Sequence, residues 1–170
     1  MDCGERDAYL DRVLIGGREK REIAIVDYDA AWPGTFEHER DRVRRALGPV
    51  ALRIEHIGST AVPGLAAKPI IDVLVTLEDP EDELAFVWRL ESAGYELRVR
   101  EPGHRMFRTP SRDVHVHVWA DTDTEVERYL SFAINCDDRR RIAWRTSASS
   151  VISRRGSGAT WTSTRTPKAA

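Results

Sequence analysis

Residues 54–75, IEHIGSTAVPGLAAKPIIDVLV, form the stretch that decides the fold. Two apolar runs are joined there through Gly58, Ser59 and Lys68, and the second run carries Asp72 among its apolar residues. A hairpin that only fills a hydrophobic core does not need this polar chemistry. The stretch therefore predicts both a piece of β-sheet and a functional site beside it.

Helices and strands are expected on both sides of this stretch. The apolar periodicity predicts helices at 5–14, 33–47, 79–94 and 124–132, and strands at 23–28, 52–57, 69–77, 95–99, 104–108 and 114–119. The near-continuous apolar run at 69–77 is typical of an interior strand that is covered on both faces. In the second helix we expect Phe36, Val43 and Leu47 to face inward, and in the third helix Leu84, Val87, Trp88 and Leu90. This order predicts an α/β (α+β) domain with a mixed β-sheet flanked by helices.

The length and composition fit one globular domain. The chain has 170 residues, of which 41% are hydrophobic and 32% charged. It has no apolar run long enough to cross a bilayer, and its charged start, MDCGERDAYLDR, lacks the apolar region of a secretory signal. Cys3 and Cys136 make no metal or redox spacing. We therefore expect a cytoplasmic protein with free thiols.

The last residues have a different composition. Residues 139–170 contain seven Arg, one Lys and no acid, so they carry +8, which leaves −10 on residues 1–138 for a net charge of −2. Eleven Ser and Thr lie in the same segment. This composition predicts that residues 133–170 form a disordered basic tail. Such a tail often binds nucleic acid.

Several polar residues in the central stretch suit a phosphate-bearing ligand. A glycine after a strand lets the backbone approach a phosphate closely, and the Ser59 hydroxyl can donate a hydrogen bond to it. Gly58 and Ser59 alternatively form and cap a turn. Lys68 can hold a phosphate as a point charge or be an exposed turn residue. Asp72 is costly to bury unless it is paired or bound to a metal.

A second group of polar residues comes later in the chain. Strand alternation in DVHVHVW, residues 113–119, places His115 and His117 on one face and three valines on the other. Two imidazoles about 7 Å apart along a strand can share a metal ion or an anion, or can lie on a solvated face. His56 or Asp72 could supply a third ligand. Four arginines on the preceding pair of strands could line an anion-binding groove or form a solvated basic face: Arg98, Arg100, Arg105 and Arg108.

The block HIGSTAVPGLAAKPIIDVLV resembles the signature of the GrpB (UPF0157) family. The preceding IVDYDAAWPGTFEHERDRVRRALG and the following AGYELRVREPGHRMFRTPSRDVHVHVW resemble the entry strand and helix, and the later strands, of that family. The resemblance covers residues 20–132. It implies a nucleotidyltransferase-like fold for residues 1–132, and related domains are fused to dephospho-CoA kinase in some bacteria. It implies no particular reaction.

The wider nucleotidyltransferase resemblance also implies roles for site residues. In that superfamily Gly-Ser holds the nucleotide phosphates, and two carboxylates one residue apart on the next strand bind divalent metal. Gly58, Ser59 and Asp72 match this pattern, but Leu74 stands in place of the second acid. Losing that carboxylate weakens Mg²⁺ binding, and imidazoles favour a softer metal or no metal.

The tail departs from the resemblance. GrpB-like chains usually continue after Phe132 with Arg-Asp, a Tyr-Glu-x-Leu-Lys helix and Tyr-x-x-Ala-Lys. Residues 145–153 and 159–168 can give such sequences when they are read one base out of frame. We hypothesise that a one-base deletion near Phe132 shifted the frame, so that the basic tail is not a binding arm. The coding DNA around codon 132 tests this hypothesis.

Taken together, the residues and the resemblance predict a GrpB-like protein, with a nucleotidyltransferase-type transferase as the candidate activity, that binds a phosphate-bearing small molecule or nucleotide. Asp72, His115 and His117 are the candidate catalytic residues and the candidate ligands of a divalent metal. The candidate ligand-binding residues are His56, Gly58, Ser59, Lys68 and Arg105. The alternative is a non-catalytic ligand-binding or partner module associated with coenzyme A metabolism, with an enzyme of that pathway as its partner. No membrane association is expected, and nucleic-acid binding is the least supported reading.

Overall fold

The structure is a computed structural model that describes residues 3–19 and 24–131. These residues all belong to one compact unit. The predictions for the basic tail, including its disorder and its out-of-frame origin, lie outside the described residues. In the described part of the chain, no helix is both long enough and apolar enough to cross a membrane.

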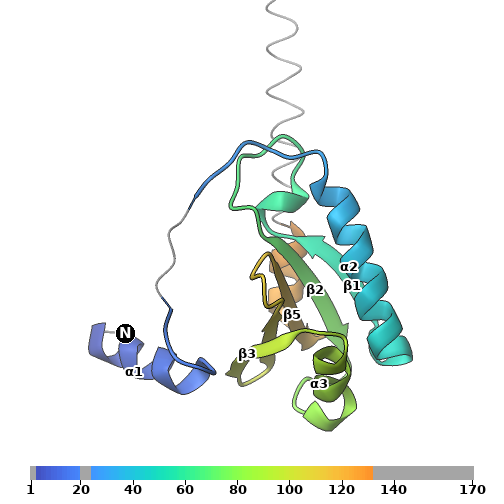
Figure 1. The fold of residues 1–170 in the computed structure, drawn as a ribbon. Coiled ribbons are helices and arrows are strands. Elements are labelled where there is room, and N and C mark those ends of the chain that lie inside the picture. The colour runs from blue at the N-terminus through green and yellow to red at the C-terminus, as the bar shows by residue number, and fades with distance from the viewer. Residues whose placement is uncertain (1–2, 20–23, 132–170) are drawn as a thin grey trace, which may run out of the picture. The chain divides into compact units, whose positions relative to one another are not determined.

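Helices and strands follow one another along the chain much as the sequence predicts (Figure 1). The elements are α1 (Cys3–Val13), α2 (Trp32–Leu47), a 3₁₀ turn η1 (Gly48–Val50), β1 (Arg53–Ile57), a 3₁₀ turn η2 (Ser59–Ala61), β2 (Ile71–Leu77), α3 (Glu83–Ser92), β3 (Glu96–Glu101), β4 (His104–Arg108) and β5 (Val114–Ala120). Residues 124–131 are again helical. The predicted α/β class is therefore confirmed.

The five strands form one mixed sheet in the order β1-β2-β5-β4-β3. β2 pairs antiparallel with β1 and parallel with β5, while β4 pairs antiparallel with β5 and β3. β2 is thus an interior strand, as its apolar sequence predicts. Its parallel partner, β5, comes after α3, β3 and β4 in the chain, so the two central strands are joined by a long crossover.

The main core lies between the sheet and the helices α2 and α3. Alternation along β2 and β5 sends Val73, Val75, Val116 and Val118 to this face, where they are fully buried. The inward residues predicted for α2 are confirmed, because Phe36, Val43 and Leu47 all belong to the same buried cluster. On the opposite face a smaller cluster joins Ile57, Leu74 and Val126, so helix 124–131 covers that side.

One local prediction is wrong, and another is right only in part. Residues 24–28 form no strand, since Val26 makes a single antiparallel bridge to Ala67 and its neighbours do not pair. The inner face predicted for α3 is right only in part. Leu90 is fully buried and Val87 packs against the core as expected, but Leu84 and Trp88 are 87% and 57% exposed, and Phe86 is buried instead. The side of α3 that faces the core is thus rotated from the predicted side, and it carries Phe86 and Leu90, which lie four residues apart.

The predicted hairpin of β3 and β4 exists, but its arginines do not line an open groove. Arg105 lies 2.7 Å from Glu81 and 2.5 Å from Glu83, and Arg100 also binds Glu83 at 2.8 Å. Arg108 binds Glu19, in the segment after α1, at 2.9 Å. Arg98, on β3, donates to the backbone of that segment at Gly17. These side chains connect elements of the fold to one another.

The face of α3 can be tested with two leucines on the same helix. Leu90→Ala should lower the free energy of unfolding by about 2–5 kcal/mol, because it leaves a cavity in the main core. Leu84→Ala should change it by less than about 0.5 kcal/mol, since that side chain is exposed. Urea denaturation of both variants measures the difference. Equal losses would contradict the observed orientation of α3.

Candidate functional site

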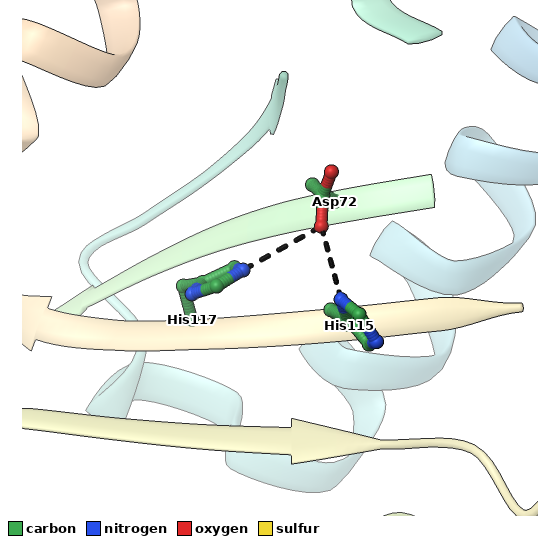
Figure 2. A group of neighbouring side chains, drawn as sticks. All are labelled: Asp72, His115 and His117. Carbon is green, nitrogen blue, oxygen red and sulfur yellow. Dashed lines mark ion pairs between the residues drawn. The ribbon is translucent and has the colours of Figure 1, made fainter. Parts of the chain in front are cut away.

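Three polar side chains converge at the start of the two central strands. The parallel register pairs Asp72 on β2 with His115 on β5, and His117 follows two residues later on the same face. Asp72 Oδ1 lies 3.3 Å from His115 Nδ1 and 3.5 Å from His117 Nε2 (Figure 2). The side chains are 17–28% exposed, so a small ligand can reach them.

Gly58 brings the backbone of the next turn against this group. Ile57 pairs with Asp72 at the end of β1, and Gly58 follows with φ 73° and ψ −169°. That conformation is essentially restricted to glycine. A Cβ atom at position 58 would lie only 2.7 Å from Asp72 Oδ2. The absence of a side chain therefore lets the turn that begins at Ser59 lie directly beside the carboxylate.

The electrostatics of the group favour a charged aspartate. Burial by itself raises the pKa of Asp72, but the contacts with His115 and His117 outweigh burial and lower it to about 2. The carboxylate is therefore ionised at neutral pH.

The donor set fits a transition metal better than Mg²⁺. One ligand atom from each of Asp72, His115 and His117 lies within 4.8 Å of the others. Two imidazoles and one carboxylate suit Zn²⁺, Fe²⁺ or similar ions, whereas Mg²⁺ prefers oxygen ligands. The nucleotidyltransferase pattern has a second carboxylate at the place of Leu74. Here that position holds a leucine, which is fully buried in the small cluster with Ile57.

A chain of hydrogen-bonding side chains continues behind His117. His117 Nδ1 lies 3.3 Å from His104 Nε2, and His104 Nδ1 lies 2.9 Å from Glu101 Oε2. The Tyr9 hydroxyl of α1 donates to the other Glu101 oxygen at 2.8 Å. Trp119 stacks on His104, with ring centroids 4.3 Å apart. Burial lowers the pKa of His104 and so favours its neutral ring, although Glu101 opposes this.

Sequence reasoning missed Glu101 and His104. A signal was present, since β4 was predicted and His104 lies on it. Only the antiparallel register of β4 with β5, which pairs His104 with Trp119, brings the ring to His117. That register was not predicted.

Two of the predicted ligand-binding residues lie elsewhere. Strand parity places His56 on the α2 face of the sheet, where it stacks on Phe36 with ring centroids 4.7 Å apart. Arg105 likewise points to the face opposite His115 and His117, where Glu81 and Glu83 bind it. Neither side chain therefore lies on the face of the sheet that carries Asp72, His115 and His117, although His56 Nε2 lies 3.1 Å from the Thr60 hydroxyl of η2.

The remaining predicted residues lie in the connection between β1 and β2. Ser59 begins η2, next to Gly58 and hence beside Asp72. Lys68 is exposed, three residues before β2 begins. Its side chain is positioned by no ion pair among the described residues. The structure thus brings together Gly58, Ser59, Asp72, His115 and His117, with Lys68 nearby in the chain.

Comparison with known proteins gives matches over the described domain. The family model described as "GrpB protein" matches residues 22–140. The chain is 52% identical over 130 residues to UPF0157 protein SCO7215 of Streptomyces coelicolor, covering 74% of this chain and 69% of that one. It is 45% identical over 102 residues to a dephospho-CoA kinase of Mycobacterium bovis, covering 53% of this chain and 25% of that one.

Solved structures match the fold as well. The crystal structure of conserved protein GrpB from Enterococcus faecalis has 37% identity and a TM-score of 0.64, over 72% of this chain and 77% of that one. A cytoplasmic RNA terminal U-transferase has 12% identity and a TM-score of 0.51, over 68% of this chain and 37% of that one. The second likeness shows a nucleotidyltransferase-like fold and carries no information on activity.

The close approach at Gly58 predicts an unequal cost for two glycine substitutions. Gly48 has a comparable strained conformation, φ 57° and ψ −131°, but nothing lies within 4 Å of its Cβ position. Gly48→Ala should lower the free energy of unfolding by about 1–3 kcal/mol, because of the backbone strain alone. Gly58→Ala should cost more, because its Cβ also displaces the Asp72 carboxylate. Urea denaturation compares the two, and an equal cost would contradict the contact.

His56 predicts a pH dependence of stability. Burial lowers the pKa of His56 from 6.5 to about 4, with Asp72 opposing the shift. The unfolded chain therefore takes up this proton first as the pH falls, and stability is lost from about pH 6.5 down to about pH 4.

His56→Phe keeps a ring against Phe36 and removes this titration, so it should lose less stability between pH 7 and pH 5 than the wild type does. Urea midpoints at the two pH values measure the effect. The exposed His38 supplies a matched control, since His38→Phe should keep the wild-type pH dependence. An unchanged pH dependence in His56→Phe would be the contrary result.

Proposed function

The chain belongs to the GrpB protein family, and on that premise we propose that it binds a phosphate-bearing small molecule beside a divalent metal ion. Asp72, His115 and His117 hold the metal in this proposal. The observation that carries it is their convergence within 4.8 Å directly beside the Gly58 turn. Neither the group of three side chains nor the Gly58 turn is needed to fold the sheet, because the main core lies on the other face.

The metal half rests on the kind of donors present. An ionised carboxylate next to two imidazoles offers one hard and two borderline ligands, a set that suits transition metals. Three protein ligands leave further coordination positions for a substrate or water, as in catalytic metal sites. A metal bound there would polarise a phosphoryl oxygen.

The phosphate half rests on Gly58, Ser59 and Lys68. Because Gly58 has no side chain, a phosphate group can approach the backbone near Asp72 closely. The hydroxyl of Ser59 can donate a hydrogen bond, and the exposed Lys68 can supply a positive charge to the same ligand. The charge of Lys68 offsets the repulsion between a phosphate and the nearby carboxylate of Asp72.

A second candidate function is a non-catalytic module that acts with an enzyme of coenzyme A metabolism. The likeness to a quarter of a dephospho-CoA kinase supports it. A module of this kind binds a CoA-type ligand or a partner enzyme without needing a metal. Metal dependence therefore separates the two candidates.

Calorimetric titration of the full chain tests the proposal. Mn²⁺ or Zn²⁺ should bind, and ADP should bind only in the presence of the metal. Loss of a residue that only supports a metal ligand usually weakens metal binding by about 10- to 100-fold. Asp72 is itself a proposed ligand, so Asp72→Asn should weaken metal binding by more than that. Glu55→Gln is the control, because Glu55 is an exposed acid on the neighbouring strand and should leave both affinities unchanged.

The outcomes discriminate among the candidates. Binding of dephospho-CoA without metal, unaffected by Asp72→Asn, would support the non-catalytic module. Absence of any metal binding by the wild type would refute the proposed metal site.

A further inference from the structure

We propose that Glu101 and His104 are positioning residues that fix the ring of His117, so that Nε2 is the only nitrogen through which His117 can bind a metal. This inference rests on the proposed function and deepens it. It assigns a role to a row of side chains, Tyr9, Glu101 and His104, that the metal and phosphate halves of the site do not use.

The row begins at Glu101, whose two carboxylate oxygens both accept hydrogen bonds. Oε1 accepts from the Tyr9 hydroxyl at 2.8 Å, and Oε2 lies 2.9 Å from His104 Nδ1. A carboxylate has no hydrogen to give, so the hydrogen between Glu101 and His104 belongs to the imidazole. His104 therefore carries its hydrogen on Nδ1.

The assignment then passes to the next ring. A neutral imidazole with a hydrogen on Nδ1 has a free lone pair on Nε2. In His104 that atom lies 3.3 Å from His117 Nδ1, so in the proposed arrangement His117 donates and His104 accepts. Turning the ring over would break its hydrogen bonds to both Glu101 and His117, and the side chain is only 9% exposed and stacked on Trp119.

The last step concerns His117 and Asp72. Nδ1 of His117 lies against His104, and the other ring nitrogen, Nε2, faces Asp72 Oδ1 at 3.5 Å. A lone pair and a carboxylate oxygen repel one another unless a cation lies between them. A metal ion bound between them would remove this repulsion and leave the bond to His104 unchanged.

Glu101 thus acts on the proposed metal ligand His117 from a distance, with the imidazole of His104 lying between the two. In metal sites the other nitrogen of a ligating histidine usually donates to a carboxylate or carbonyl, which orients the ring. Here His104 transmits that effect from Glu101. An imidazole held in this way by its Nδ1 presents Nε2 to a metal ion. Because imidazole ligands favour transition metals, the site should bind Zn²⁺ in preference to Mg²⁺.

Nitrogen-15 NMR of the histidine rings tests the inference without any metal. In the full-length wild type, His117 should show a protonated Nδ1, and His104 should show a protonated Nδ1 with an unprotonated Nε2. A His117 ring that carries its only hydrogen on Nε2 would overturn the inference. This readout does not depend on metal binding.

Zinc affinity, measured by competition with a chromophoric chelator, gives a second test. His104→Phe keeps the stacking on Trp119 but removes the acceptor for His117, and it should weaken Zn²⁺ binding by about 10- to 100-fold. His104→Gln should restore most of the affinity, because its amide can accept from His117 and donate to Glu101. His38→Phe replaces an exposed histidine and should have no effect.

The two proposals fail in different ways. If the wild type binds neither Zn²⁺ nor Mn²⁺ while the NMR shows the expected tautomers, the metal site fails and the ring assignment stands. If Zn²⁺ binds the wild type and His104→Phe equally, the positioning role is overturned and the metal site stands. Urea denaturation of His104→Phe establishes that any loss of affinity occurs in a folded protein, and an unfolded variant leaves the NMR result to decide.

Discussion

The parallel pairing of β2 with β5 is the constraint on which the candidate site depends. Side chains alternate between the faces of a sheet, so a slip of one residue would bring a valine next to Asp72 in place of His115. The register is held from the other face, where Val73 and Val116, which pair with each other, are buried in the main core. The hydrophobic core thus determines which polar groups meet on the opposite face.

Much of this could be predicted from the sequence because it follows from local patterns. Alternation in residues 113–119 placed His115 and His117 on one face, and the isolated acid in an apolar run marked Asp72. That these residues meet could not be predicted from composition or periodicity. The pairing joins strands separated by α3, β3 and β4, and several sheet orders satisfy the same apolar pattern.

The differences between the expected and the observed arrangement also have physical causes. His56 and Arg105 have the chemistry of ligand-binding residues, but strand parity and neighbouring partners place them on the core side. The strand predicted at 23–28 had the right alternation, yet only Val26 found a backbone partner. His104 was overlooked because its importance comes from register, which sets its ring against His117 across two strands.

Leu74 explains why the ligand set departs from the nucleotidyltransferase pattern. A carboxylate at this position would point to the same face as Asp72, but Leu74 is fully buried against Ile57 and Val126. Helix 124–131 therefore packs where a second acid would need water or a metal. An unpaired carboxylate there would lose its hydration without gaining a partner. A helix packed at this place and a second acid on β2 are thus alternative solutions, and with the helix in place further metal ligands have to come from the neighbouring strand. In the proposed site β5 provides His115 and His117 for this role, and β4 places His104 behind the second of these rings.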